Sequence, residues 1–193
     1  MNPAKIFIAA FLVNNIILMR FIGLCPFFGV STSLNTSAGM SIAVLFVMLL
    51  AAWVSWVLYH FLLIPLGLVF LRTAVFILVI AALVQFVEMF LKRNLRNLYS
   101  AMGIYLPLIT TNCAILGVTF LNIDYKFNLL QATIFALGTA FGFGLAILLF
   151  AAIRERLDDA PISPSFKGYP IAFIGTALVS LAFMGFTALF GIS

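Results

Sequence analysis

The chain has 193 residues, of which 65% are hydrophobic and only 8% are charged, and its mean hydropathy is +1.27. Soluble domains carry about a quarter of their residues as Asp, Glu, Lys or Arg, so the composition excludes a soluble globular protein and indicates an integral membrane protein. The net charge of +5 reflects membrane topology and attraction to anionic lipid, and does not argue for nucleic-acid binding.

Apolar segments of about 20 residues, the length that crosses a bilayer as a helix, follow one another along the chain. Six such spans leave no room for a soluble catalytic domain, and the longest connection, Arg154 to Pro170, is expected to be only a loop. The first segment lacks a basic n-region and a cleavage site, so we expect a retained span and not a signal peptide. We therefore predict an all-α integral membrane protein with a single transmembrane domain over residues 1–193. The six predicted spans lie near residues 5–30, 40–63, 69–91, 100–121, 129–152 and 171–190.

Basic residues are distributed unequally between the two sides of this topology. Six fall in the connections after the third and fifth spans, and three fall on the opposite side. By the positive-inside rule, the first group faces the cytoplasm, which puts both termini outside. The six are Lys92, Arg93, Arg96, Arg154, Arg156 and Lys167, and the three are Lys5, Arg72 and Lys126.

The first span contains a helix-breaking stretch, FIGLCPFFGVST, from Phe21 to Thr32. Pro26 follows Cys25 directly, lacks an amide hydrogen and suits the first turn of a new helix. Gly23 and Gly29 permit a break and the close approach of another segment. Irregular backbone at membrane depth is tolerated only where protein buries it or it lines a cavity, so we expect a broken helix at a site.

The fourth span repeats this pattern around the second of the chain's two cysteines. The segment CAILGVT, Cys113–Thr119, matches CPFFGVS, Cys25–Ser31, at the cysteine, at Gly-Val and at a small hydroxyl residue. Pro107 and the polar run Thr110-Thr111-Asn112 stand just before Cys113. A broken fourth helix is therefore expected as well.

The two halves together indicate an internal repeat. Each half, approximately 1–91 and 100–193, holds three spans, and because three is odd, the second half crosses the membrane in the opposite sense. An inverted repeat of this kind would bring Cys25 and Cys113 toward each other near mid-depth.

The residues alone leave three roles open for the two thiols. They are idle packing, a disulfide between the halves, or metal ligation by soft thiolates. Iron–sulfur clusters are typically held by four cysteines, and this chain has two. A cluster would therefore need two more ligands from a partner.

Other polar and small residues of the spans have more than one interpretation. Intramembrane Asn14, Asn15, Arg20 and Glu88 are functional hypotheses by default. Glu88 has Lys92 four residues on, which also fits a local helix pair, and Arg20 either faces a partner or snorkels to the interface. The fifth span carries small-residue packing positions at Gly138, Gly142 and Gly144.

Six segments of the chain, spread over nearly every span, resemble the A-type membrane proteins of Rnf complexes. Rnf complexes are bacterial membrane oxidoreductases that couple electron flow between ferredoxin and NAD to ion translocation. The E-type protein of the sodium-pumping NADH:quinone oxidoreductase is similar, but Pro26 and the Asn14-Asn15 pair look more like the Rnf version. The segments are LVNNIIL (Leu12–Leu18), GLCPFFGVS (Gly23–Ser31), VQFVEM (Val84–Met89), LPLITTNCAILGV (Leu106–Val118), FAAIRERL (Phe150–Leu157) and LAFMGF (Leu181–Phe186).

The resemblance implies a subunit without independent catalysis that relays electrons through a [2Fe-2S] cluster in the middle of the bacterial inner membrane. Cys25 and Cys113 would supply two ligands, and a homologous six-helix partner of opposite orientation, the E-type protein of the Rnf complex, would supply two more. The B, C, D and G components of the Rnf complex would be further partners, and both termini would be periplasmic. Gly23, Pro26, Thr110, Thr111 and Asn112 are expected around the cluster.

Two other function classes stay open from the residues. A secondary transporter also shows inverted repeats and broken helices, but usually with a charged or polar substrate site at mid-depth. A structural assembly subunit would need no cysteines.

Overall fold

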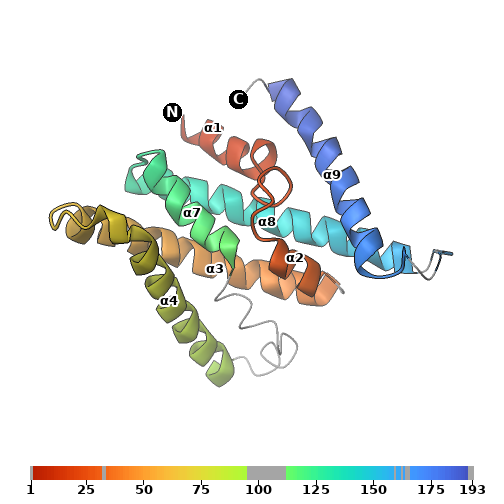
Figure 1. Cartoon of the computed structure of the whole chain (residues 1–193), viewed down its shortest axis with the longest axis horizontal. Coiled ribbons are helices and arrows are strands. Elements are labelled where there is room, and N and C mark those ends of the chain that lie inside the picture. Colours follow the sequence, from red (N-terminus) through yellow and green to blue (C-terminus); the bar gives the residue numbers. More distant parts are fainter. Residues whose placement is uncertain are drawn as a thin grey trace.

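The computed structural model describes residues 2–31, 34–94, 112–158, 160–161, 163 and 166–190. These residues form helices joined by turns and irregular segments, with no strand among them (Figure 1). The expected all-α class is therefore confirmed.

Two long helices, α3 and α8, form the centre of the molecule. The first, α3 (Leu34–Leu58), continues into the π-helical turn η2 (Tyr59–Leu63), and α8 spans Leu129–Asp158. They make the most extensive helix pairing in the described chain and lie side by side in Figure 1. In the most apolar part of the stretch Leu129–Leu157, 67% is buried inside the chain. This helix is therefore the main internal support for its neighbours.

Two further helices lie toward the periphery. The 3-10 turn η3 (Val69–Leu71) leads into α4 (Arg72–Asn94), which packs against α3 and against α7 (Cys113–Asp124). The last helix, α9 (Tyr169–Phe190), contacts α8 and the N-terminal segment. In the most apolar part of the stretch Val69–Met89, which includes most of α4, only 17% is buried. Most of its apolar surface is therefore left for lipid or for another protein.

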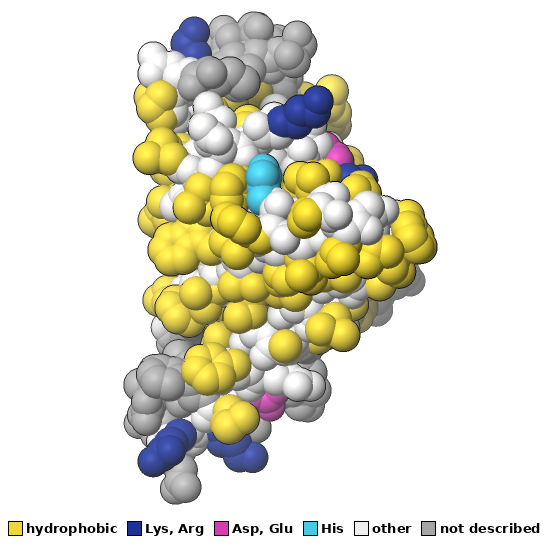
Figure 2. Space-filling view, turned by 90° about the vertical axis from the view of Figure 1, so that its left-hand side faces the viewer, with side chains coloured by type: hydrophobic (Ala, Val, Ile, Leu, Met, Phe, Trp, Pro, Cys, Tyr) yellow, Lys and Arg dark blue, Asp and Glu magenta, His cyan; other side chains and the backbone are white. Residues whose placement is uncertain are grey.

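Within the described part of the chain, three helical stretches are long and apolar enough to cross a membrane. They are Leu34–Leu63, Val69–Met89 and Leu129–Leu157, and shorter apolar helices occupy Pro3–Val13, Cys113–Asp124 and Tyr169–Gly185. Hydrophobic side chains spread over the middle of the face shown in Figure 2, and basic side chains gather toward its upper and lower parts. This distribution suits a protein surrounded by hydrocarbon.

The first apolar segment is interrupted, as its sequence predicts. It begins as α1 (Pro3–Ile8) and the π-helical turn η1 (Ala9–Val13), leaves the helix at Asn14 and resumes as α2 (Leu24–Val30). In the fourth segment α7 begins at Cys113, and the part of that segment before residue 112 lies outside the described residues, so the expected break there stays a prediction.

Asn15 explains why the backbone can leave the helix inside an apolar protein. Its side chain is fully buried, and its Oδ1 accepts hydrogen bonds from the backbone amides of Ile17, at 3.1 Å, and Leu18, at 3.4 Å. Its Nδ2 donates to the carbonyl oxygen of Gly142 in α8 at 2.8 Å. An asparagine side chain thus replaces backbone partners that an interrupted helix loses.

Glycines of α8 allow α1 and η1 to pack closely against it. A Cβ placed on Gly138 would lie 2.9 Å from the carbonyl oxygen of Phe7, and one on Gly142 would lie 2.8 Å from that of Phe11. A Cβ on Gly144 would approach Ser41 of α3 at 3.3 Å. The expected small-residue packing of this span is confirmed.

Helices extend beyond the apolar limits that hydropathy marks. We expected the connection after the fifth span to begin at Arg154, but α8 continues through Asp158, so this boundary was wrong. Arg, Glu and Leu are good helix formers, and the segment stays helical after its apolar character ends. The α3 helix likewise begins at Leu34, before the apolar limit near residue 40.

The glycine contact in α8 predicts a stability difference between two glycine-to-alanine variants. In Gly142→Ala the new methyl group would meet the Phe11 carbonyl, so we expect a loss of about 1–3 kcal/mol from overpacking. Gly185→Ala, in α9, places its methyl where no atom lies within 4 Å, and no loss is expected. Thermal unfolding of the two purified variants in detergent tests this, and equal midpoints would contradict the close approach.

Candidate functional site

Both cysteines lie at the start of a helix. Cys25 is the second residue of α2, and Cys113 is the first residue of α7. Both are free thiols with exposed side chains. Pro26 stands in the first turn of α2, where the missing amide hydrogen costs no helical hydrogen bond.

The two cysteine segments touch each other at Gly23. A Cβ on Gly23 would lie 3.0 Å from the Cβ of Ala114 and 3.6 Å from Oδ1 of Asn112, the two residues that flank Cys113. Gly23 has φ +94°, a left-handed conformation that glycine adopts without strain. The structure therefore brings together the starts of α2 and α7, which are far apart in the sequence (Figure 1).

Asn112 shapes the start of α7. It has extended backbone, and its Oδ1 accepts a hydrogen bond from the amide of Ala114 at 3.0 Å, which caps the helix. The residue is 2% exposed, and its Nδ2 has no hydrogen-bond partner among the residues that the structure describes. A buried amide donor without a partner is costly, so this nitrogen marks a place where an acceptor would be stabilising.

Arg154 fastens the other end of α2, a role that its sequence position did not reveal. Its Nη1 donates to the carbonyl oxygen of Phe28 at 3.0 Å and to Oγ of Ser31 at 3.4 Å. The cation thus satisfies the carboxyl end of α2, the helix that carries Cys25. In the sequence, Arg154 serves only as one of the basic residues that indicate the topology. The signal that it offers for a structural role is a basic residue near the end of a helix, where a cation is stabilising.

Aromatic packing holds α2 against its neighbours. The rings of Phe27 and Phe150 of α8 stack with centroids 4.6 Å apart, and those of Phe28 and Phe173 of α9 lie 4.3 Å apart. Such pairs add stability beyond the apolar area that they bury. The short α2 helix is therefore fixed by α8 and α9.

The described residues do not form a complete metal site by themselves. No group of three or more His, Cys, Asp or Glu side chains among them could hold a metal ion. The donor set that they offer consists of two thiols and the free Asn112 amide. Such a set fits half of a four-thiolate cluster site.

The other predicted polar residues have separate surroundings. Asn15 organises the helix break, while the Arg20 Nη2 donates to the hydroxyl of Tyr125 at 2.7 Å. Glu88 is half-buried on α4. The predicted site residues Thr110 and Thr111, and Pro107 near them, lie outside the described residues.

Residues 4–190 match the family model described as Rnf-Nqr subunit, membrane protein. The chain belongs to the Rnf-Nqr family. The resemblance seen in its motifs is thereby confirmed, and the family places these helices in a membrane.

Several bacterial members of the Rnf-Nqr family are similar over nearly their whole length. The A component of the ion-translocating oxidoreductase complex of Pectobacterium atrosepticum is 53% identical over 186 residues, which cover 96% of each chain. Proteins of the same name from Yersinia enterocolitica and Yersinia pseudotuberculosis are 52% and 50% identical over 184 residues, 95% of each chain.

The contact at Gly23 predicts the cost of a methyl group there. Gly23→Ala adds the left-handed penalty of about 1–2 kcal/mol and a collision with Ala114 costing about 1–3 kcal/mol. Gly67→Ala is the matched control, because Gly67 has φ +66° but no atom lies within 4 Å of the added Cβ. Thermal unfolding should show a larger loss for Gly23→Ala, and equal losses would mean that the two cysteine segments do not touch.

The Arg154 contact predicts local loosening of α2. Arg154→Gln removes a charged donor, and hydrogen bonds to charged groups contribute about 1.5–3 kcal/mol. Amide hydrogen exchange of residues 24–31 should therefore become at least about tenfold faster. The control is Arg156→Gln, on the exposed side of the same helix; if it accelerates exchange as much, Arg154 does not hold α2.

Proposed function

We propose that this chain is the A-type membrane protein of an Rnf complex, which couples electron transfer between ferredoxin and NAD to the translocation of Na⁺ or H⁺. Its membership of the Rnf-Nqr family supports this assignment, as does its 50–53% identity to proteins named as the A component of an ion-translocating oxidoreductase complex. The protein works as part of an oxidoreductase complex and has no catalysis of its own.

Within that role, Cys25 and Cys113 would be two of the four ligands of a [2Fe-2S] cluster. The observation that carries the proposal is the contact of Gly23 with Asn112 and Ala114, because it brings the two thiol-bearing helix starts to one place. Such a cluster would supply one-electron transfer. The two thiolates would hold its iron, and the contact of Gly23 with Ala114 keeps the starts of their helices together.

Asn112 has a supporting part in this proposal. Its free Nδ2 would donate a hydrogen bond to a cluster or cysteine sulfur, and such bonds raise the reduction potential of iron–sulfur centres. The start of α7 adds the positive end of a helix dipole, which favours an anionic group in an apolar environment. Gly23 and Pro26 shape the same wall, and Thr110 and Thr111 are proposed to extend it.

The remaining two thiolates come from a homologous six-helix protein, the E type of the Rnf complex, in the opposite orientation. A two-cysteine chain cannot complete a four-cysteine site, so the cluster belongs to the pair. The B, C, D and G components of the complex are the further partners that bring electrons to and from this centre.

The proposed topology is six spans in two inverted repeats in the bacterial inner membrane. Two features support it: the matching cysteine motifs, and the order of described helices, which runs short, long, long in α2–α3–α4 and again in α7–α8–α9. Both termini are proposed to be periplasmic, and α1 begins near the edge of the molecule where α9 ends (Figure 1).

The second candidate is the equivalent component of a sodium-translocating NADH:quinone reductase, because the family description names Rnf and Nqr together. The two candidates differ in their electron carriers: an Rnf complex transfers electrons between ferredoxin and NAD, whereas the alternative transfers them from NADH to quinone.

Cysteine replacement in the purified complex tests the cluster assignment. Cys25→Ser and Cys113→Ser should each remove about two iron atoms per complex, together with the matching absorbance and paramagnetic-resonance signal, and should abolish electron transfer. Ser55→Ala is the matched control, since this buried hydroxyl only bonds back to its own helix in α3. If both serine variants keep the iron and the spectrum of the wild type, the ligand assignment is wrong.

A further inference from the structure

Residues 14–23, which join η1 to α2, form a loop that we name the break loop. Its backbone folds back on itself and is held by its own hydrogen bonds, so an anchor at one point of the loop bears on where α2 begins. Three of these bonds run from the amides of Met19, Phe21 and Ile22 to the carbonyl oxygens of Asn15, Ile17 and Ile16, at 2.9, 3.1 and 3.0 Å.

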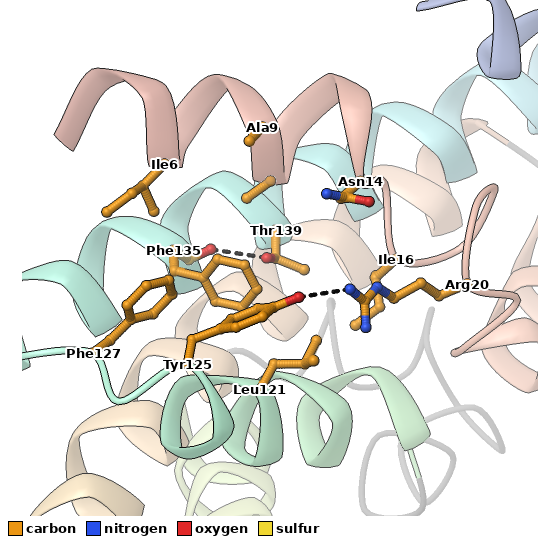
Figure 3. A pocket seen from close by; sticks show the side chains of 11 residues that line it. Ile6, Ala9, Asn14, Ile16, Arg20, Leu121, Tyr125, Phe127, Phe135 and Thr139 are labelled. Atoms are coloured by element: carbon orange, nitrogen blue, oxygen red, sulfur yellow. Dashed lines mark hydrogen bonds between the residues drawn. The ribbon is translucent and has the colours of Figure 1, made fainter. Parts of the chain in front are cut away.

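The break loop borders a cavity, so part of it lacks close packing partners. The cavity, of about 340 Å³, lies between α1 and η1 on one side and the end of α7 and the start of α8 on the other (Figure 3). Asn14, Ile16 and Arg20 of the loop line it. Arg20 donates from Nη2 to the hydroxyl of Tyr125 at 2.7 Å, but both side chains are exposed. A long, exposed side chain is a weak anchor, because ordering it costs side-chain entropy.

A buried hydrogen bond joins the break loop to α9. The Ser180 hydroxyl donates from Oγ to the carbonyl oxygen of Leu18. Ser180 is 6% exposed and Leu18 is 1% exposed, so water cannot replace this donor. A buried carbonyl that loses its partner keeps the full cost of its desolvation. The bond to α9 is therefore a stronger anchor for the loop than the exposed contact of Arg20.

The same helix also touches the chain beyond Cys25. The ring of Phe173 in α9 lies with its centroid 4.3 Å from that of Phe28 in α2. Phe173 and Ser180 are seven positions apart, about two helical turns, so they lie on the same face of α9. This face therefore contacts the chain both before Cys25, at Leu18, and after it, at Phe28.

The two cysteine helices are supported in a crossed manner. Cys25 lies in the first half of the chain, and α9, the last helix of the second half, contacts its surroundings. Cys113 begins α7 in the second half, and α4, the last helix of the first half, packs on α7 with the rings of Phe76 and Phe120 5.6 Å apart. The packing of these two outer helices therefore helps to set where the two thiols lie.

We propose that Ser180 is a positioning residue for Cys25. By holding the Leu18 carbonyl it fixes the break loop, and with the loop it fixes the start of α2. The inference rests on the proposed function, because this position matters for electron transfer only if Cys25 binds iron. Ser180 acts through the backbone of the loop, and loss of its hydroxyl lets the loop open more often, which exposes the ligand position and alters the surroundings of its sulfur.

Iron release from the intact complex tests this role. In Ser180→Ala the buried carbonyl loses its donor, so iron should pass to an added ferrous chelator about tenfold faster than in the wild type. The paramagnetic-resonance signal of the reduced complex should also shift or broaden, because Cys25 is held less uniformly. The protein composition and the initial iron content verify that each variant complex is assembled.

Thr176→Val is the matched control on the same helix. It also removes a buried hydroxyl, but that hydroxyl donates to the Ala172 carbonyl of α9 itself at 2.8 Å. Iron release and the resonance signal should therefore stay as in the wild type.

Amide hydrogen exchange supplies a measurement that does not depend on iron. Exchange of residues 16–23 in the complex should be about tenfold faster in Ser180→Ala than in the wild type or in Thr176→Val. Unchanged exchange in Ser180→Ala would mean that α9 does not hold the loop. Equal acceleration in Thr176→Val would mean that α9 is loosened as a whole.

Two further outcomes separate this inference from the proposed function. Faster exchange in Ser180→Ala with wild-type iron release and signal, in a complex whose iron is lost in Cys25→Ser, would leave the ligand assignment intact and overturn the positioning role. Wild-type iron and spectrum in Cys25→Ser would overturn the ligand assignment and, with it, this role of Ser180.

Discussion

The structure depends on the buried amide of Asn15, which allows the chain to leave a helix inside an apolar protein. An interrupted helix leaves amide and carbonyl groups without partners, and in hydrocarbon each costs several kcal/mol. Asn15 accepts hydrogen bonds from two amides of the following turn and donates to the Gly142 carbonyl of α8. The break is therefore hydrogen-bonded and anchored to the central helix. The segment that leads to Gly23 and α2 therefore starts from a fixed point on α8.

Close packing then sets the geometry of the cysteine site. Gly142 allows η1 to lie directly on α8, and Gly23 allows the start of α2 to lie directly on the start of α7. At the far end of α2, Arg154 binds the Phe28 carbonyl and the Ser31 hydroxyl. A helix of seven residues has little stability of its own, so these contacts determine where Cys25 lies. Such external support is what the proposed cluster ligand would need, because the surrounding shell orients the ligands of a metal and tunes its properties.

The segment between Asn14 and Gly23 contributes to the cysteine site and to the apolar cavity beside it. Its end at Gly23 belongs to the cysteine site, where the free Asn112 amide and the start of α7 favour negative charge such as that of the proposed cluster. Arg20, in its middle, lines the cavity and donates a hydrogen bond to the hydroxyl of Tyr125. The proposed cluster would take its other two ligands from a homologous protein, which fits a protein that works inside a membrane complex.

The class of the fold and several residues of the candidate site could be predicted from the amino-acid sequence alone. Hydropathy determined the membrane class and the approximate limits of the helices, and Pro26 and Gly23 marked the break. The paired Cys-x-x-x-Gly-Val motifs singled out the two thiols, and six segments spread over the chain indicated the family. These signals are local, because they depend on composition and on spacings of a few residues. The tertiary structure decided the partners: Asn15 with Gly142, separated by 127 positions, Arg154 with Phe28, separated by 126, and Gly23 with Ala114. No local pattern specifies such pairs, since they arise only when long helices pack and their buried polar groups must each find a partner.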